Sequence, residues 1–365
     1  MTNPNRIARE KTRSVKIGDL IVGGGAPVVV QSMLNTKPDD LLGAREQVEA
    51  LAEAGCRIAR IAVPSKIALE CFALTARRSP IPIVADIHFD YKLAIAAVEA
   101  GAAAIRINPG NIGGFDKVDQ VIEACRAAEV PIRIGVNAGS LDPEVAAEAG
   151  LSAAEQLAAS AIQYVEYFEA HDFEQIVVSA KAHDVATTVT TYRLLAERIP
   201  EVPLHLGVTE AGGLRQGTIK SACAIGALLL DGIGDTIRVS LTADPLREVE
   251  VGYDILRACG LYRAGVEIVS CPTCGRTQVD LERIATEVER RLASIKRPLS
   301  VAVMGCVVNG PGEAAGANIG AACGRGSAQI FVDGEVRYSV PEEKIADALL
   351  AEAEQYPGVD GSPAA

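Results

Sequence analysis

The chain has 365 residues, of which 49% are hydrophobic and 4% aromatic, and its formal net charge is −12. A charge of this sign excludes a general electrostatic attraction to nucleic acid or to anionic membranes. The sequence contains no run of about 18 apolar residues that could span a membrane, and its first residues lack the apolar core of a signal peptide. We therefore expect a cytoplasmic protein that has neither nucleic acid nor a membrane among its partners.

From residue 28 to residue 260, short apolar runs alternate with segments whose apolar residues recur every three or four positions. Eight strands, each followed by a helix, predict a closed (β/α)8 TIM barrel over residues 1–262. An open, doubly wound sheet is the alternative architecture. The eight expected strands are Val28–Met33, Ile58–Val63, Pro82–Ile87, Ala104–Pro109, Ile132–Val136, Gln175–Lys181, Pro203–Thr209 and Thr236–Leu241.

After residue 260 the alternation changes, which predicts a smaller α/β domain over residues 263–365. One helix is expected from residue 281 to 295, where an apolar stripe recurs at helical spacing after a possible cap at Asp280. Another is expected from residue 341 to about 354. The expected strands are Val266–Ser270, Leu299–Met304, Asn318–Ala322, Gln329–Val332 and Val336–Val340.

Three cysteines of this domain directly follow predicted strands. Cys271 and Cys274 end the first strand as a Cys-x-x-Cys turn, and Cys306 follows the second strand. A metal or cluster site needs a further ligand, for which Glu313 and Cys323 are the candidates. Spacing alone leaves structural zinc and an iron–sulfur cluster equally favoured. The missing second Cys-x-x-Cys pair and the Gly/Pro-rich segment around Glu313 favour the cluster.

A carboxylate as the fourth ligand would have a chemical consequence. Three soft thiolates would hold three irons firmly, whereas the hard oxygen of Glu313 would bind the fourth iron less tightly. That iron could then exchange its ligand for an oxygen of a substrate. The other cysteines stand among apolar neighbours and are assigned no function: Cys56, Cys71, Cys125, Cys223 and Cys259.

Cations recur inside the predicted barrel strands. A charge in a strand that is buried on both faces is costly unless it pairs or opens to the mouth of the barrel, where active sites of this fold lie. An ion pair is the simpler explanation for any one arginine. Several cations at one mouth are better explained by an anionic ligand such as a phosphate or diphosphate. The residues are Arg60, Arg106, Arg133, Lys181 and Arg238.

Further polar residues share these strands or follow them. Asn137 lies on the same strand face as Arg133, and Ser240 on the same face as Arg238. Glu210 directly follows the seventh predicted strand, which makes it a candidate general acid or base. His88 at another strand end is a weaker candidate. The sequence lacks a phosphate-binding loop of the nucleotide type, so a nucleotide is not indicated.

At these residues the sequence resembles the 4-hydroxy-3-methylbut-2-enyl diphosphate synthase family, in its short bacterial two-domain form. The matching motifs extend over nearly the whole chain, and the last two are very specific. They are Val30–Met33, Ala85–Asp90, Arg106–Gly113, Gly135–Leu141, Thr209–Gly213, Gly232–Arg238, Ser270–Arg276 and Met304–Ala314.

The resemblance implies a [4Fe–4S] cluster on Cys271, Cys274, Cys306 and Glu313, which removes Cys323 from the ligand set. It implies a substrate, 2-C-methyl-D-erythritol 2,4-cyclodiphosphate, whose ring is opened and one hydroxyl removed. The electrons would come from reduced flavodoxin or ferredoxin. The substrate-binding residues it implies are Arg60, His88, Arg106, Arg133, Asn137, Lys181, Arg238, Ser240 and Asn309.

The same resemblance makes Glu210 the proposed proton donor and implies a homodimer in which the cluster domain of one chain covers the barrel of the other. Two alternatives stay open on the residues alone. One is a non-redox barrel enzyme that acts on a phosphorylated metabolite and has a structural zinc site. The other is a non-catalytic iron–sulfur carrier, which would leave the strand cations unexplained.

Overall fold

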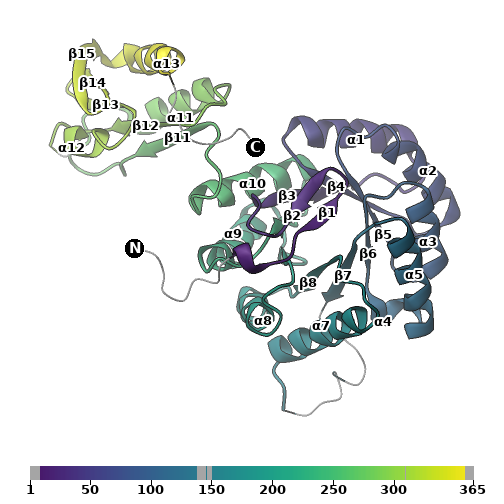
Figure 1. The fold of residues 1–365 in the computed structure, drawn as a ribbon. Helices are drawn as coiled ribbons and strands as arrows, with labels where there is room; N and C mark the ends of the chain where they lie inside the picture. Colours follow the sequence, from purple (N-terminus) through teal and green to yellow (C-terminus); the bar gives the residue numbers. More distant parts are fainter. Residues whose placement is uncertain (1–8, 138–144, 146–149, 309, 358–365) are drawn as a thin grey trace. The chain divides into compact units, whose positions relative to one another are not determined.

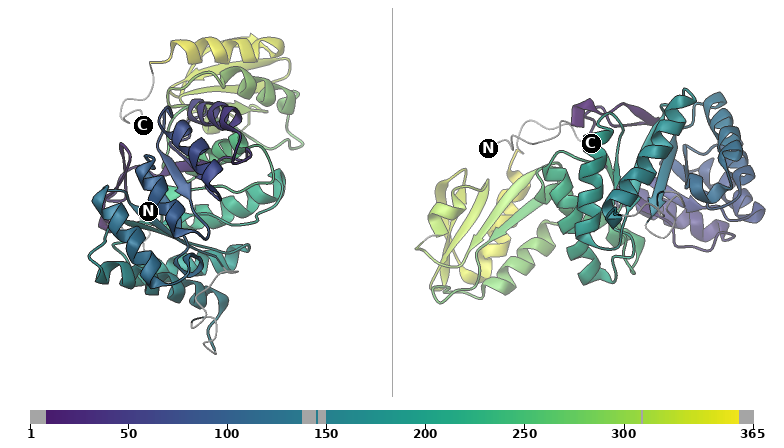
Figure 2. Two further views of the ribbon diagram at one scale, coloured as in Figure 1. Left: turned by 90° about the vertical axis from the view of Figure 1, so that its right-hand side faces the viewer. Right: turned by 90° about the horizontal axis from the view of Figure 1, so that it is seen from below.

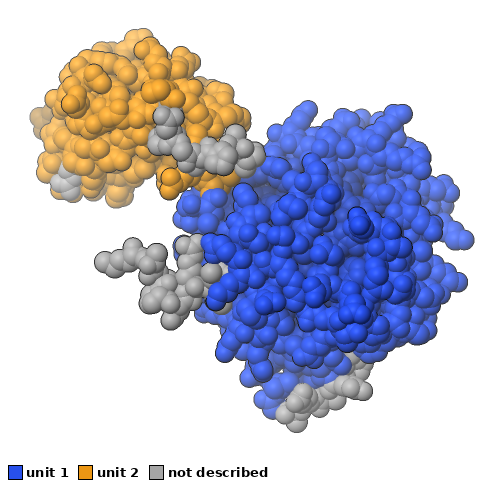
Figure 3. Space-filling model, in the orientation of Figure 1, with its two compact units in different colours: residues 1–261 blue, residues 262–365 orange. Residues whose placement is uncertain are grey.

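The computed structural model describes residues 9–137, 145, 150–308 and 310–357. Its contacts divide the chain into two compact units, residues 1–261 and residues 262–365 (Figure 3). No helix within the described ranges is long and apolar enough to cross a membrane. Each unit has its own sheet and its own hydrophobic core, and each is described separately below.

The first unit is a barrel of parallel strands, which confirms the predicted fold class. Its sheet has the order β8-β7-β6-β5-β4-β3-β10-β9, and a parallel bridge between Val178 and Leu204 joins its two ends. The strands are β3 (Val29–Met33), β4 (Ile58–Ala62), β5 (Ile83–Asp86), β6 (Ala104–Ile107), β7 (Ile132–Asn137), β8 (Ile176–Lys181), β9 (His205–Leu206) and β10 (Thr236–Ile237).

Strands β9 and β10 are much shorter than the sequence predicts. Just before β9, the Leu204 N–H donates to the buried carboxylate of Asp235 at 2.9 Å. A side chain therefore replaces a carbonyl of the neighbouring strand as the acceptor. The ladder nevertheless continues beyond β10 in one bond, from the Arg238 N–H to the Leu206 carbonyl at 3.0 Å. The alternation of apolar residues predicted the direction of these segments but not where their ladders stop.

Helices surround the barrel (Figures 1 and 2). Aspartate or serine side chains cap several of them by accepting a hydrogen bond from a first-turn N–H, as Asp40 does for α1 and Ser65 for α2. The helices are α1 (Leu41–Glu53), α2 (Lys66–Ala76), α3 (Tyr91–Glu99), α4 (Pro109–Ile112), α5 (Phe115–Ala127), α7 (Ala153–Ala170), α8 (Val185–Arg198), α9 (Leu214–Leu230) and α10 (Pro245–Ala258).

A short hairpin closes the N-terminal end of the barrel, and the sequence did not indicate it. Strands β1 (Val15–Ile17) and β2 (Leu20–Val22) pair antiparallel after a short 3-10 turn, Arg9–Lys11. The side chains of Val15, Ile17 and Val22 are buried against residues at the beginning of five barrel strands, namely Val29, Ile58, Val84, Ala104 and Val177. The opposite, C-terminal end is therefore the open mouth.

The second unit is a five-stranded mixed sheet in the order β11-β12-β13-β14-β15. Helices α11 (Leu281–Leu292) and α13 (Ile345–Gln355) pack into the main core on one face, and α12 (Gly310–Ala314) packs on the other. The sequence did not predict α12, because glycine disfavours helix. The strands are β11 (Val266–Ser270), β12 (Leu299–Met304), β13 (Ile319–Gly324), β14 (Ser327–Val332) and β15 (Glu335–Pro341).

Candidate active site

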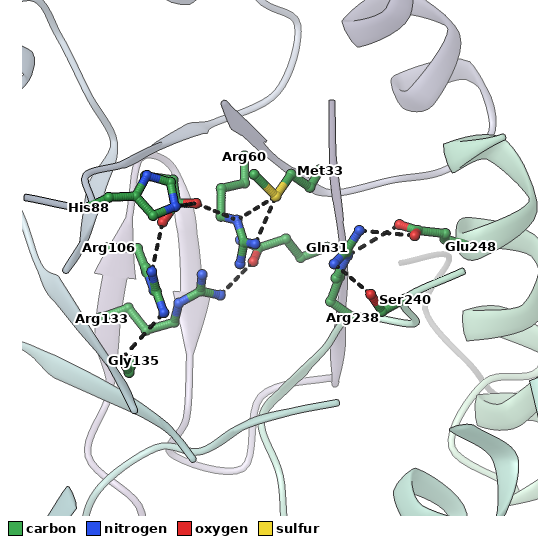
Figure 4. Close-up of polar contacts among 11 residues, drawn as sticks. Gln31, Met33, Arg60, His88, Arg106, Arg133, Gly135, Arg238, Ser240 and Glu248 are labelled. Atoms are coloured by element: carbon green, nitrogen blue, oxygen red, sulfur yellow. Dashed lines mark hydrogen bonds and ion pairs between the residues drawn. The ribbon is translucent and has the colours of Figure 1, made fainter. Parts of the chain in front are cut away.

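Charged side chains from neighbouring strands meet inside the barrel (Figure 4). The strand register pairs Asp86 with Arg106 and Arg106 with Arg133, so the three residues stand side by side on the inner face. Arg133 is the second residue of β7, whereas Asp86 ends β5. The charges therefore line the wall from the middle of the barrel up to the mouth.

Asp86 is the centre of one group of these charges. Its carboxylate lies 3.6 Å from Arg60 Nε, 3.3 Å from Arg106 Nη1 and 3.5 Å from His88 Nε2. Burial alone would raise the pKa of Asp86, but the nearby Arg60 and Arg106 outweigh it and hold that pKa below its usual range. A single ionised carboxylate thus orients two arginines and a histidine.

Arg60 and Arg106 keep weak contacts that a ligand could replace. Arg60 also donates to the thioether sulfur of Met33, from Nη2 at 2.7 Å and from Nε at 3.1 Å, and sulfur is a weak acceptor. Burial lowers the pKa of Arg60 to about 10. Arg106 Nη2 reaches the carbonyl of Gly135 at 3.3 Å. These guanidinium groups are positioned, but they are not saturated with strong acceptors.

Arg133 lies deeper and has no carboxylate within ion-pair distance among the described residues. Its Nη1 donates to Gln31 Oε1 at 2.7 Å, while its Nε and Nη2 are buried without a hydrogen-bond partner in the described part of the chain. Burial, followed by the charges of Arg60 and Arg106, holds the pKa of Arg133 well below its usual range. A buried guanidinium with two unused donors is poised to bind an anion.

Lys181 ends β8 next to Asn137, which ends β7 in the same register. The lysine is 9% exposed, and within the described ranges no carboxylate forms an ion pair with it. Burial and then the charge of Arg133 hold the pKa of Lys181 well below its usual range. A ligand that brings negative charge would reverse this penalty.

Arg238 is more fully satisfied than the other cations. Glu248 accepts from its Nε at 3.2 Å and its Nη2 at 2.9 Å, and Ser240 Oγ accepts from its Nη1 at 2.9 Å. The sequence interpretation did not single out Glu248. One feature of the sequence could have identified it. Glu248 is an acidic residue on the buried side of α10, where Pro245 and Gly252 are also buried.

Glu210 lies in the loop after β9 with its side chain exposed. Its backbone has φ +52°, in the left-handed region that residues other than glycine, asparagine and aspartate seldom adopt. Such backbone strain is found most often at functional positions. Asn309, another predicted site residue, lies outside the described residues.

In the second unit, Gly305 and Arg276 interact with two of the candidate cluster ligands. The Gly305 N–H, which precedes Cys306, donates to Cys271 Sγ at 3.2 Å. A hydrogen bond to Cys274 raises the pKa of Arg276, and the negative charges of Cys306 and Glu313 add to this effect. Arg276 hydrogen bonds in turn lower the pKa of Cys274. A thiol with a lowered pKa forms the ligating thiolate more readily.

These groups are not arranged as metal ligands. Within the described parts of the chain, no three His, Cys, Asp or Glu side chains converge closely enough to hold a metal ion. Three thiols and a carboxylate are nevertheless donors that suit an iron–sulfur cluster. Cys323 is different. It is fully buried in the core beneath α11 and α13, where burial raises its pKa to about 12.

Comparisons with known proteins cover both units. The family model of the GcpE TIM-barrel domain matches residues 12–253, and that of the GcpE protein C-terminal domain matches residues 267–355. The 4-hydroxy-3-methylbut-2-en-1-yl diphosphate synthase (flavodoxin) of Geobacter sulfurreducens is 54% identical over 347 residues, covering 95% of this chain and 98% of that protein. The enzyme of the same name from Frankia casuarinae is 52% identical over 359 residues, covering 97% and 93%.

Among solved structures, the dihydropteroate synthase of Yersinia pestis aligns with 68% of this chain and 98% of its own. The sequence identity is 15% and the TM-score is 0.48.

Proposed function

The chain belongs to the GcpE family of 4-hydroxy-3-methylbut-2-en-1-yl diphosphate synthases, and we propose that it reductively opens 2-C-methyl-D-erythritol 2,4-cyclodiphosphate. The product is 4-hydroxy-3-methylbut-2-enyl diphosphate, a precursor in the methylerythritol phosphate pathway of isoprenoid biosynthesis. Ring opening with loss of a hydroxyl is a reduction, so the chain is an oxidoreductase.

The excess of positive charge inside the barrel carries this proposal. Two buried carboxylates, Asp86 and Glu248, pair with three of the arginines, while Arg133 and Lys181 form no ion pair among the described residues. A cyclic diphosphate supplies the missing negative charge in one compact group. Arg106, Arg133 and Lys181 are proposed to hold its oxygens, and Arg60, His88, Asn137, Arg238 and Ser240 to complete the pocket of the barrel. Asn309, which belongs to the second unit and lies outside the described residues, is a further proposed substrate-binding residue.

The second unit is the proposed carrier of a [4Fe–4S] cluster held by Cys271, Cys274, Cys306 and Glu313. When bound, this cluster supplies electrons and one iron with an exchangeable ligand. The assignment of the carboxylate is supported by its hard oxygen donors, which bind iron less covalently than thiolates do. The core position of Cys323 supports leaving it out of the ligand set.

Glu210 is the proposed proton donor to the departing hydroxyl. Its support is the exposed carboxyl group directly after a barrel strand and the left-handed backbone that holds it there. Flavodoxin is the donor in the names of the relatives, and we propose reduced flavodoxin, or a ferredoxin in its place, as the electron donor.

A homodimer is also part of the proposal. Large apolar side chains are exposed around the barrel mouth, each in a first helical turn or in the loop that follows a strand. An apolar rim of this kind is typical of a surface that another protein covers. Its residues are Leu42, Ile67, Phe89, Phe115 and Leu214, which are 41–72% exposed.

Anaerobic purification tests the proposal directly. The protein should be brown, contain about four irons per chain and convert the cyclic diphosphate when reduced flavodoxin is added. Iron analysis, visible and EPR spectra and product assay measure these properties. A colourless, zinc-loaded protein, or activity that survives oxygen and iron chelation, would instead support the non-redox barrel enzyme.

A further inference from the structure

One hydrogen bond of the barrel ladder is replaced by a side chain. At the junction of β8 and β9, the Val178 N–H donates to the Pro203 carbonyl at 2.9 Å. In a regular parallel ladder the next bond lies two residues further along both strands, from the Ala180 N–H to the His205 carbonyl. This direct bond is not formed.

The hydroxyl of Tyr192, on α8, stands between the two backbone groups. The Ala180 N–H donates to Tyr192 Oη at 3.2 Å, and Tyr192 Oη donates to the His205 carbonyl at 2.6 Å. The tyrosine is fully buried, and burial raises the pKa of its hydroxyl, which therefore stays protonated and able to donate. Two strands that would otherwise bond directly are bridged through one oxygen atom.

Lys181 is the residue that follows Ala180, so this bridge fixes the backbone from which its side chain extends. The ammonium group lies close to Gly207, where an added Cβ would be 2.8 Å from Lys181 Nζ. The lysine side chain thus occupies the space that the missing Cβ of Gly207 leaves open.

We propose that Tyr192 is a positioning residue: by bridging β8 and β9, its hydroxyl sets the strand spacing that directs the Lys181 ammonium toward the anionic group of the substrate. This inference rests on the proposed function, in which Lys181 binds the diphosphate. In Tyr192→Phe the two backbone groups either bond directly and draw the strands together or stay unpaired and loosen them. Both outcomes displace Lys181, and a displacement of about 1 Å at a binding group is enough to weaken binding strongly.

Steady-state kinetics of the anaerobically prepared holoenzyme test the proposal. We expect Tyr192→Phe to raise KM for the cyclic diphosphate about tenfold and to change kcat less than about twofold, because the lost contact is made to substrate and transition state alike. Tyr253→Phe is the matched control. It removes a hydroxyl that donates to the Gly55 carbonyl at 2.6 Å, in the loop before β4 at the closed end of the barrel. Its KM should equal that of the wild type.

A double-mutant cycle shows whether Tyr192 acts through Lys181. In the Lys181→Ala background, adding Tyr192→Phe should leave KM unchanged. An equal rise of KM in both backgrounds, or no rise in either, would overturn the inference on Tyr192 alone. An unchanged KM in Lys181→Ala itself would overturn the assignment of Lys181 to the substrate, and with it this inference.

A second variant keeps the inference testable if Tyr192→Phe does not fold. Gly207→Ala leaves the hydroxyl bridge in place and fills the space beside Lys181 Nζ, although it also approaches the Arg238 carbonyl. It should raise KM in the wild-type background and raise it less in Lys181→Ala. An equal rise in both backgrounds would show that the spacing around Lys181 does not control binding.

Discussion

Glu248 holds Arg238 by both of its carboxylate oxygens, at 2.9 and 3.2 Å, although one residue lies on helix α10 and the other in the segment that follows strand β10. The same carboxylate accepts from Ser32 Oγ at 3.0 Å and from the Leu241 N–H at 2.9 Å. One buried acid therefore fixes an arginine proposed to bind substrate and joins strand β3 to the segment that follows β10.

Removing the charge of Glu248 should destabilise the barrel. We expect Glu248→Gln to lower the free energy of unfolding by about 3 kcal/mol, because the partly buried Arg238 loses its counter-charge. Urea unfolding measures this change. Glu250→Gln, on the same helix, is the control, since its pair with Arg247 is exposed to solvent and should contribute almost nothing to stability. Equal losses in the two variants would contradict the structural role of Glu248.

The depressed pKa of Lys181 predicts how substrate binding depends on pH. The ammonium loses its proton at a lower pH than an ordinary lysine, so KM should rise with pH before free lysines titrate. In Lys181→Arg this rise should disappear, because arginine stays charged. The stability of the ligand-free protein should depend on pH in the opposite way. It should increase as the pH rises through the pKa of Lys181 in the folded state, and stop increasing near the pKa of lysine in the unfolded chain. Kinetics and thermal melts over a pH series check both trends.

Arg133 should lower the stability of the ligand-free protein and strengthen the binding of an anionic ligand. In the ligand-free protein, Arg133→Met removes a buried charge that lacks an ion pair in the described part of the chain, so we expect a gain of about 1 kcal/mol. Inorganic diphosphate should raise the Tm of the wild type, by the equivalent of about 2.7 kcal/mol at a hundredfold excess over Kd. It should have little effect on the variant. A variant that is less stable and still responds to diphosphate would refute this role.

The backbone conformation of Glu210 predicts that this residue, too, lowers stability while it supports activity. Asparagine tolerates the left-handed region better, so Glu210→Asn should be more stable by about 1 kcal/mol and much less active. Glu129 has nearly the same φ, +53°, before β7 at the closed end of the barrel. Glu129→Asn should therefore gain similar stability and keep full activity. Chemical unfolding and turnover measurements on both variants provide the comparison.

The two candidates for the fourth cluster ligand can be separated by iron retention. Glu313→Ala should lose iron and most activity, because the proposed ligand is removed. Cys323→Ser should retain iron, although the buried hydroxyl costs about 1–3 kcal/mol of stability. Iron content and EPR spectra of anaerobic samples measure retention. The reverse pattern would make Cys323 the ligand.

The sequence was sufficient to predict the barrel, because apolar runs and helical stripes recur with the spacing of βα units. It also predicted which strands carry cations, since Arg60, Arg106 and Arg133 interrupt apolar runs that have to be buried. Pairing between distant elements could not be predicted. The contacts of Glu248 and Tyr192 depend on how a helix lies over the strands, and local patterns do not encode that.

Other features were missed for local reasons. Strands β1 and β2 have three residues each, too few for an alternation to stand out from the polar segment before them. Helix α12 begins with Gly310 and Pro311, a pair of residues that is typical of loops. The cysteine spacing indicated a shared site for Cys271, Cys274 and Cys306. Among the described residues these three thiols are not close enough together to hold a metal ion, so their role as ligands stays a prediction.

The β1–β2 hairpin covers the N-terminal end of a barrel whose interior is filled by side chains. Val15, Ile17 and Val22 are buried at that end, so the proposed substrate would enter, and the product leave, through the mouth at the opposite end. The product would then have to leave before the next substrate could bind. A partner that covers the apolar rim, as in the proposed homodimer, would have to lift away once in every turnover. Uncovering the mouth would then be a step that can limit the rate of turnover, whatever the rate of the chemical step.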